Sequence, residues 1–184
     1  MIVKPVASVA GHRACRYHPR MQLRLAQRQD AEGIRDIYNH EVVAGTNTFD
    51  LVPRSRRDQQ SWIDRHRGAH PAIVALDDVD RAKVLGFAVV SPFRDRAAYA
   101  TTVEDSVYVH RDARGHGVGR ALLDELLRLA AAQGFHAVIA RIASENQPSI
   151  GLHRACGFEL VGVEREVGRK HGRWLDVVEL QRML

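Results

Sequence analysis

The sequence predicts a single α/β domain, and three observations lead to this fold class. The chain has 184 residues, 45% of them hydrophobic, which suffice for one core but hardly for two domains. Segments in which apolar residues alternate, as in strands, are interspersed with segments in which they recur every three or four residues, as in helices. A glycine-rich turn at positions 115–119 leads from one such strand into a long amphipathic helix.

The first third of the chain predicts one strand and two helices. Residues 22–25 form a short strand, and Asp30 caps the helix that follows. One face of that helix carries Ile34, Ile37, Tyr38 and Val42. A second, strongly polar helix over 55–67 lies on the outside of the domain, held to it by Trp62 and Ile63.

The rest of the chain predicts a hairpin and then alternating strands and helices. Residues 71–76 and 84–90 pair around a turn, and another strand spans 103–110. The helix over 117–133 buries Leu122, Leu126 and Leu129, and Gly134 ends it. The remaining elements are a strand at 136–143, a helix at 147–156 ended by Gly157, and strands near 158–164 and at 175–182.

The glycine-rich turn is typical of a diphosphate-binding loop. Gly115, Gly117 and Gly119 permit a tight backbone turn with several N–H groups exposed, and the next helix directs its positive dipole end to the same place. Arg114 adds a cation. A dinucleotide-binding turn is disfavoured because the following strand, 136–143, ends without a carboxylate. A plain connection between strand and helix is the alternative.

Several separated motifs together resemble one enzyme superfamily. Val-Tyr-Val at 107–109 followed by Arg-Gly-His-Gly-Val-Gly at 114–119 is similar to the acetyl-CoA-binding motif of the GNAT N-acetyltransferases. The segments 102–109, 146–149, 152–158 and 167–176 resemble the phosphinothricin and methionine-sulfoximine acetyltransferase branch. The resemblance covers about residues 21 to 184 and implies an α+β domain. Its central sheet would be mixed and mostly antiparallel. The elements would follow one another along the chain in the order strand-helix-helix-strand-strand-strand-helix-strand-helix-strand-strand.

The resemblance implies acetyl-CoA as cosubstrate and a set of residues that hold it. The backbone of Val107, Tyr108 and Val109 would pair with the pantetheine arm like an added strand. The diphosphate would lie on the loop formed by Arg114, Gly115, His116, Gly117, Val118, Gly119 and Arg120, where His116 contributes through its backbone. Asn146 and Ser149 would contact the cofactor, although both also suit the capping of the next helix.

Two residues are candidates for proton transfer. Glu104 precedes the cofactor-binding part of its strand, and a partly desolvated carboxylate suits a general base that deprotonates the acceptor amine. An exposed strand carboxylate is the alternative. His153 stands where many relatives carry a tyrosine, and the resemblance implies that it takes part in protonating the leaving thiolate. A purely structural histidine is the alternative.

The acceptor site is predicted from basic residues. Arg94 and Arg96 follow the strand at 84–90, and a guanidinium matches a carboxylate or phosphinate. Arg94 is the preferred anchor, and Arg96 is equally compatible with solvent exposure. Ser106 and Lys170 complete the predicted substrate contacts together with Glu104. Lys170, Gly172 and Trp174 match the C-terminal family motif and suit either the pocket or a twofold interface.

Charge and the chain ends limit the possible partners. Residues 1–20 contain Lys4, Arg13, Arg16 and Arg20 without an acid, so removing these from the net charge of +5 leaves +1 for the remainder. We therefore expect no nucleic-acid groove. We interpret residues 1–20 as a mobile extension and residues 21–184 as the domain. The absence of a leader or a long apolar run predicts a cytoplasmic protein without a membrane span.

The cysteines and histidines exclude two further classes of site. Cys15 and Cys156 provide no disulfide framework, and Cys156 is expected in the core. The histidines show no metal-ligand spacing, so we predict no metal. The resulting hypothesis is a homodimeric N-acetyltransferase acting on a small amino-acid-like acceptor through a ternary complex. Acetylation of another small amine or a protein N-terminus, and a non-catalytic acyl-CoA-binding regulator, are the alternatives.

Overall fold

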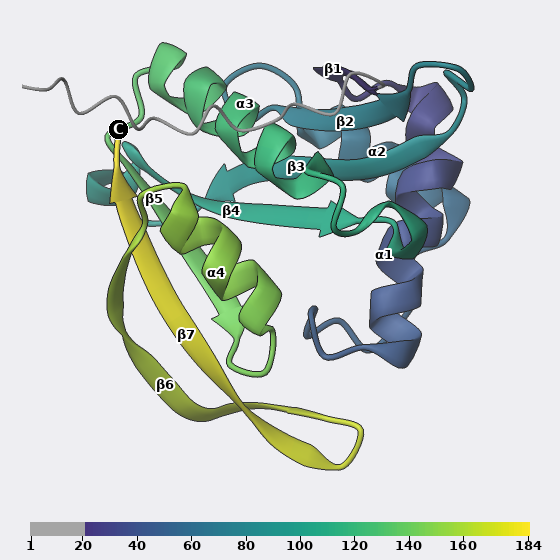
Figure 1. Cartoon of the computed structure of the whole chain (residues 1–184). Helices are drawn as coiled ribbons and strands as arrows, with labels where there is room; N and C mark the ends of the chain where they lie inside the picture. The colour runs from purple at the N-terminus through teal and green to yellow at the C-terminus, as the bar shows by residue number, and fades with distance from the viewer. Residues whose placement is uncertain (1–20) are drawn as a thin grey trace, which may run out of the picture.

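The computed structural model describes residues 21–184, which form one seven-stranded sheet with helices on both faces (Figure 1). The strands, in the sheet order β1-β2-β3-β4-β5-β7-β6, are β1 (Met21–Leu25), β2 (Ala72–Asp77), β3 (Val84–Pro92), β4 (Thr102–Val109), β5 (Ala137–Ala143), β7 (Arg173–Met183) and β6 (Glu159–Lys170). The helices are α1 (Ala31–Ala44), α2 (Arg56–Arg65), α3 (Val118–Ala132) and α4 (Gln147–Ala155). The predicted fold class and element order are confirmed. The predicted extension, with Cys15, lies outside the described residues.

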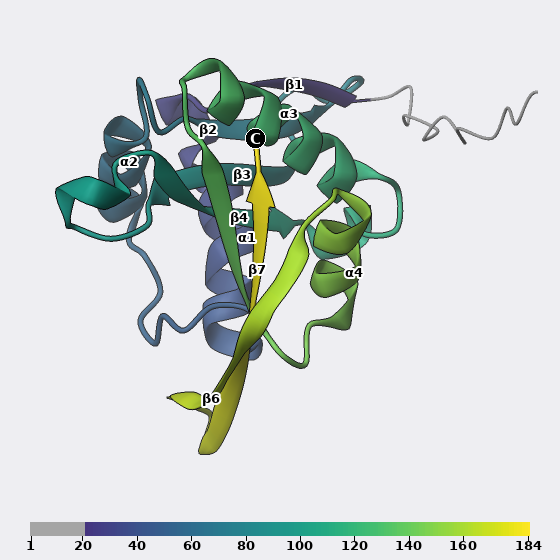
Figure 2. The ribbon, with the colours of Figure 1, turned by 90° about the vertical axis from the view of Figure 1, so that its left-hand side faces the viewer.

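Two hydrophobic cores flank the sheet. Helices α1 and α2 pack on one face against β2 and β3, through side chains such as Ile34, Trp62 and Phe87. Helices α3 and α4 pack on the other face, where Leu122 and Leu126 are completely buried. Figure 2 shows the two helix layers on either side of the strands. Consecutive residues of β3 and of β4 therefore face different cores. This alternation decides which groups surround each functional side chain.

The sheet opens between β4 and β5, the one pair of neighbouring strands that runs parallel. Their register begins at Thr102 opposite Ala137 and ends at Asp105 opposite Ala140. Beyond Asp105, β4 continues to pair with β3 but has no strand on its other side. The two strands diverge there (Figure 1), so residues 106–109 present backbone groups without a partner strand. Such an edge can pair with an extended ligand.

The structure corrects several local predictions. The last two strands form a hairpin that extends well past residue 164, to a turn in which His171 and Gly172 have positive φ angles. The sequence pattern obscures this because a bulge with Glu166 at φ 51° interrupts the register. Asp30 occupies the capping position of α1 but binds Arg24 and the backbone instead of the helix end. In α3, buried Leu123 and Leu127 join the stripe, whereas Leu129 is only partly buried.

Candidate active site

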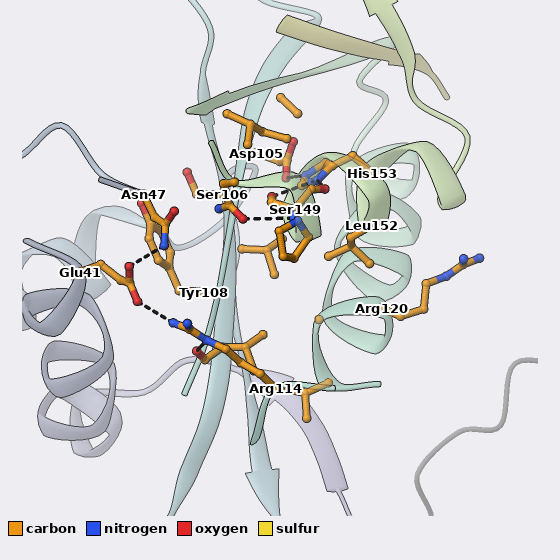
Figure 3. A pocket seen from close by; sticks show the side chains of 18 of the residues that line it. Glu41, Asn47, Asp105, Ser106, Tyr108, Arg114, Arg120, Ser149, Leu152 and His153 are labelled. Carbon is orange, nitrogen blue, oxygen red and sulfur yellow. Dashed lines mark hydrogen bonds and ion pairs between the residues drawn. The ribbon is translucent and has the colours of Figure 1, made fainter. Parts of the chain in front are cut away.

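A pocket of about 400 Å³ occupies the opening between β4 and β5 and extends over the start of α3 (Figure 3). Most of the predicted cofactor-binding residues line it: Val107, Tyr108, Val109, Arg114, Gly115, Gly117, Val118, Gly119, Arg120, Asn146 and Ser149. Ser106 and His153 also line the pocket, whereas His116 and Glu104 do not. The structure adds residues that were not predicted from the sequence, notably Glu41, Asn47, Asp105 and Leu152. Segments far apart in the chain thus meet in one groove.

The glycine loop has the geometry expected of an anion site. Gly115 and Gly117 adopt φ angles of 76° and 82°, the left-handed region that favours glycine, and nothing else occupies the space beside either residue. Gly117 caps α3 without a side-chain hydrogen bond, so the first N–H groups of this 15-residue helix remain available. At Gly119 a Cβ atom would lie 3.2 Å from Leu152 Cδ2, so the loop packs closely on α4. A diphosphate fits this arrangement of donors.

Arg114 is held by α1 rather than directed at the glycine loop. Its Nη2 lies 2.5 Å from Oε1 of Glu41, whose side chain is buried, and Asn47 Nδ2 donates to Glu41 Oε2 at 2.6 Å. Figure 3 shows this bridge beside Tyr108. The guanidinium is therefore engaged by a carboxylate, and this ion pair fixes the loop against α1. Arg120 in turn binds Asp124 and the Ala155 carbonyl.

Glu104 lies on the face of β4 that is turned toward α1 and α2. Across the sheet it is opposite Ser91, just as Tyr108 is opposite Phe87, and Phe87 belongs to the core of that face. Burial raises the pKa of Glu104, and the positive charge of Arg141 opposes this only in part. Glu104 is half-buried at the point where β4 and β5 begin to diverge. A carboxylate with a raised pKa at this place suits proton abstraction.

His153 forms a buried pair with Asp105 on the opposite face of β4. His153 Nε2 lies 3.0 Å from Asp105 Oδ2, and both side chains are buried. The other ring nitrogen, Nδ1, donates to the Ser149 carbonyl at 2.7 Å. Burial by itself would lower the pKa of His153, but the hydrogen bond and the charge of Asp105 outweigh it and leave the pKa raised. The sequence signal for Asp105 is an acid at a buried strand position, which requires a partner.

The structure also places Asn146, Cys156 and the two arginines after β3. Asn146 caps α4 by accepting a hydrogen bond from the Ser149 N–H at 3.2 Å, so its capping role is present alongside its place in the pocket. Cys156 is buried, as predicted, and burial raises the pKa of its thiol to about 12, so it offers no thiolate for an acyl-enzyme. Arg94 and Arg96 are exposed on the segment after β3 and do not line the pocket.

Lys170 is a structural residue, which corrects its predicted role as a substrate contact. Its side chain is 3% exposed, and Nζ donates to the carbonyls of Thr48 at 2.7 Å and Glu41 at 3.1 Å. These bonds attach the tip of the β6–β7 hairpin to the loop after α1. In the same region Phe49 packs so closely on Gly168 that a Cβ atom there would overlap its ring. The loop that carries Asn47 is thereby fixed beside the groove.

We expect Lys170→Met to lower the free energy of unfolding by about 2 kcal/mol, because it leaves two buried carbonyls without their donor. Urea unfolding followed by circular dichroism measures the loss. Lys83→Met, at an exposed position, is the matched control and should stay within about 0.5 kcal/mol of the parent. Equal stability of the two variants would contradict the anchoring role.

Residues 21–184 contain neither a metal-binding cluster nor a helix that could span a membrane. No group of three or more histidine, cysteine, aspartate or glutamate side chains in this part of the chain is arranged to hold a metal ion. Over the same residues, no helix combines the length and apolar character that crossing a bilayer requires.

Comparison with known proteins agrees with this geometry. The acetyltransferase (GNAT) family profile matches residues 32–158. An L-methionine sulfoximine/L-methionine sulfone acetyltransferase of Pseudomonas aeruginosa is 43% identical over 153 residues, covering 83% of this chain and 88% of that protein. A phosphinothricin N-acetyltransferase of Streptomyces coelicolor is 38% identical over 165 residues, covering 89% and 96%.

A solved structure shares the fold. A GNAT superfamily phosphinothricin acetyltransferase from Sinorhizobium meliloti, solved in complex with acetyl-CoA, superposes with a TM-score of 0.84 at 43% identity, covering 89% of this chain and 88% of that one. The chain belongs to the acetyltransferase (GNAT) family and is an acetyl-CoA-dependent N-acetyltransferase.

Proposed function

We propose that the protein transfers acetyl from acetyl-CoA to the α-amino group of a small amino-acid-like acceptor, directly within a ternary complex. The observation that carries this proposal is the placement of Glu104 and of the His153–Asp105 pair on opposite faces of β4, beside the point where β4 and β5 separate. An amine arriving from the Glu104 side and a thioester lying along the groove would meet in that opening. No covalent intermediate is needed for such a reaction.

The proton balance of the reaction fits this arrangement. An ammonium acceptor loses two protons when it becomes an amide. Glu104 takes the first, directly or through a water molecule, and so produces the neutral amine that attacks the thioester carbon. A backbone N–H on the unpaired edge of residues 106–109 would stabilise the oxyanion. The second proton goes to the sulfur as the C–S bond breaks, from the His153–Asp105 side of the groove.

The acceptor class is inferred from the relatives and from local charge. The relatives' names specify methionine sulfoximine, methionine sulfone and phosphinothricin, all compounds with an α-amino group. Glu104 is influenced by the carboxylates of Glu164 and Glu179 as well as by Arg141. This mainly negative surrounding favours a cationic ammonium group at the position where the base must reach it.

A single assay tests the acceptor assignment. CoA thiol release is measured with acetyl-CoA and a panel of phosphinothricin, methionine sulfoximine, methionine sulfone, free amino acids, polyamines and short peptides. We expect the first three to be turned over fastest. Preference for peptides would instead identify a protein N-terminal acetyltransferase and overturn the acceptor assignment. Binding of acetyl-CoA without turnover of any acceptor, in single-turnover mixtures, would identify a regulator.

We expect Arg94→Gln to raise the KM for the acceptor about tenfold while kcat changes little, because a guanidinium that binds the acceptor's acidic group contributes to binding before reaction. In the structure this side chain stacks near Phe93 and Tyr99, at 4.7 and 5.6 Å from their ring centres, which fixes its direction. Steady-state kinetics with the best acceptor provides the measurement. Arg96→Gln, made in parallel, reports whether the second guanidinium contributes to acceptor binding. An unchanged KM in both variants would rule out an arginine anchor for the acceptor on this segment.

We also propose that the protein is a cytoplasmic homodimer that pairs through the β6–β7 hairpin. The outermost strand, β6, has an unpaired edge, and Val161, Val163 and Val167 on it are about half exposed. Trp174 on β7 is 60% exposed. Apolar side chains gathered at a free strand edge favour burial against another copy. Sedimentation equilibrium measures the mass, and a monomer at micromolar concentration would contradict the dimer.

A further inference from the structure

The His153–Asp105 pair leaves no nitrogen of the imidazole free for the reacting sulfur. Nδ1 lies 2.7 Å from the Ser149 carbonyl, and because a carbonyl only accepts hydrogen bonds, Nδ1 carries a hydrogen. Nε2 is engaged by Asp105 Oδ2 at 3.0 Å. The ring also packs edge-on against Phe158, 5.0 Å away, which fixes its orientation. A thiolate in the groove is thus not reached by His153 without breaking one of these bonds.

Asp105 has an oxygen that the protein does not use. Its Oδ1 atom is buried and has no hydrogen-bond partner, although the residue lines the groove and is only 5% exposed. Leaving a buried carboxylate oxygen unpaired is costly, so such an atom points to a ligand group. In residues 21–184, the other buried side-chain atom without a partner is Gln59 Nε2, and Gln59 is not among the residues that line the groove.

Asp105 stands at the end of the paired part of β4, where the groove begins. Asp105 and Ala140 are the last residues at which β4 and β5 still pair, and the groove begins immediately beyond them. Figure 3 shows Asp105 beside His153 and Ser149 at the inner end of the pocket. Arg141 from β5 also lines the pocket, while Glu104 occupies the opposite face of β4.

We propose that Asp105 is the catalytic residue that moves the second proton, with His153 as the residue that positions it. The proposal rests on the acetyl transfer proposed above. In the tetrahedral intermediate, the carboxylate Oδ1 takes a proton from the positively charged amine nitrogen. The C–S bond then breaks, its electron pair stays on sulfur, and Oδ1–H gives the proton to that sulfur. CoA thiol and the amide leave, and the carboxylate is restored.

Binding of the product tests this role without any acceptor. If Oδ1 accepts a hydrogen bond from the thiol of CoA, the protein binds CoA about five- to tenfold more tightly than desulfo-CoA, which lacks the sulfur. We expect this preference in the unaltered protein and its loss in Asp105→Asn, measured by calorimetric titration. Equal affinity of the unaltered protein for the two compounds would overturn the proposal, and this comparison does not depend on the folding of any variant.

Kinetics tests the proton transfer itself. We expect Asp105→Asn to lower kcat about 100-fold while the affinity for acetyl-CoA stays within about threefold. Asp30→Asn is the matched control. Asp30 is buried like Asp105 and is paired with a basic side chain, Arg24, but it lies away from the groove. It should leave kcat and the preference for CoA unchanged. Full turnover in Asp105→Asn would refute the role, whereas a parent protein inactive on every acceptor would refute only the proposed function.

Discussion

Glu104→Gln is expected to lower turnover by about 100- to 10,000-fold while acetyl-CoA affinity remains unchanged. The amide has the shape of the carboxylate but cannot accept the ammonium proton, so the attacking nitrogen stays protonated. Binding of acetyl-CoA is spared because Glu104 does not line the cofactor groove. Stopped-flow detection of CoA release, together with calorimetric titration of acetyl-CoA, separates the two effects. An unchanged rate would exclude Glu104 as the base.

The pH dependence of the rate provides a second test of Glu104. Because burial raises the pKa of Glu104, the rate should fall on the acid side at a pH above the ordinary range of a glutamate. Glu179→Gln is a suitable control, since the charge of Glu179 contributes to this shift. Removing that charge should move the acid limb to lower pH and leave the maximal rate within about threefold. If the acid limb stays at the same pH in Glu179→Gln, a group other than Glu104 limits the rate at low pH.

Gly117→Val is expected to weaken acetyl-CoA binding about tenfold or more. A β-branched residue at φ 82° is strained by about 1–2 kcal/mol, and the loop relieves this strain by turning its N–H groups away from the diphosphate. The free space beside Gly117 excludes a steric clash within the protein as the cause. Calorimetric titration gives the dissociation constant.

The chain offers a matched control for this substitution at the other end of the same helix. Gly134 has a φ angle of 83° and equally free space, but it lies outside the groove. Gly134→Val should cost similar stability in urea unfolding without a change in acetyl-CoA affinity. If both variants bound acetyl-CoA like the parent, the glycine loop would not be the diphosphate site.

Much of the fold could be predicted from the sequence because its signals are local. The periodicity of Leu122 and Leu126 identifies α3, and Gly134 marks its end. The long hairpin β6–β7 was underestimated because the bulge at Glu166 breaks strand alternation, which is the signal on which such a prediction depends. The anchoring role of Lys170 was missed for another reason. Its partners are backbone carbonyls more than 120 residues away in the chain.

The sequence by itself determined the fold class, the glycine loop before α3 and the family, since each depends on residue types at fixed short spacings. Only the tertiary structure decided which neighbouring side chains face the same site. Adjacent residues of a strand point to opposite faces, so Glu104 turns toward α1 and α2 while Asp105 meets His153 in the lining of the groove. The separation of β4 and β5, which no local pattern encodes, brings both faces to one opening.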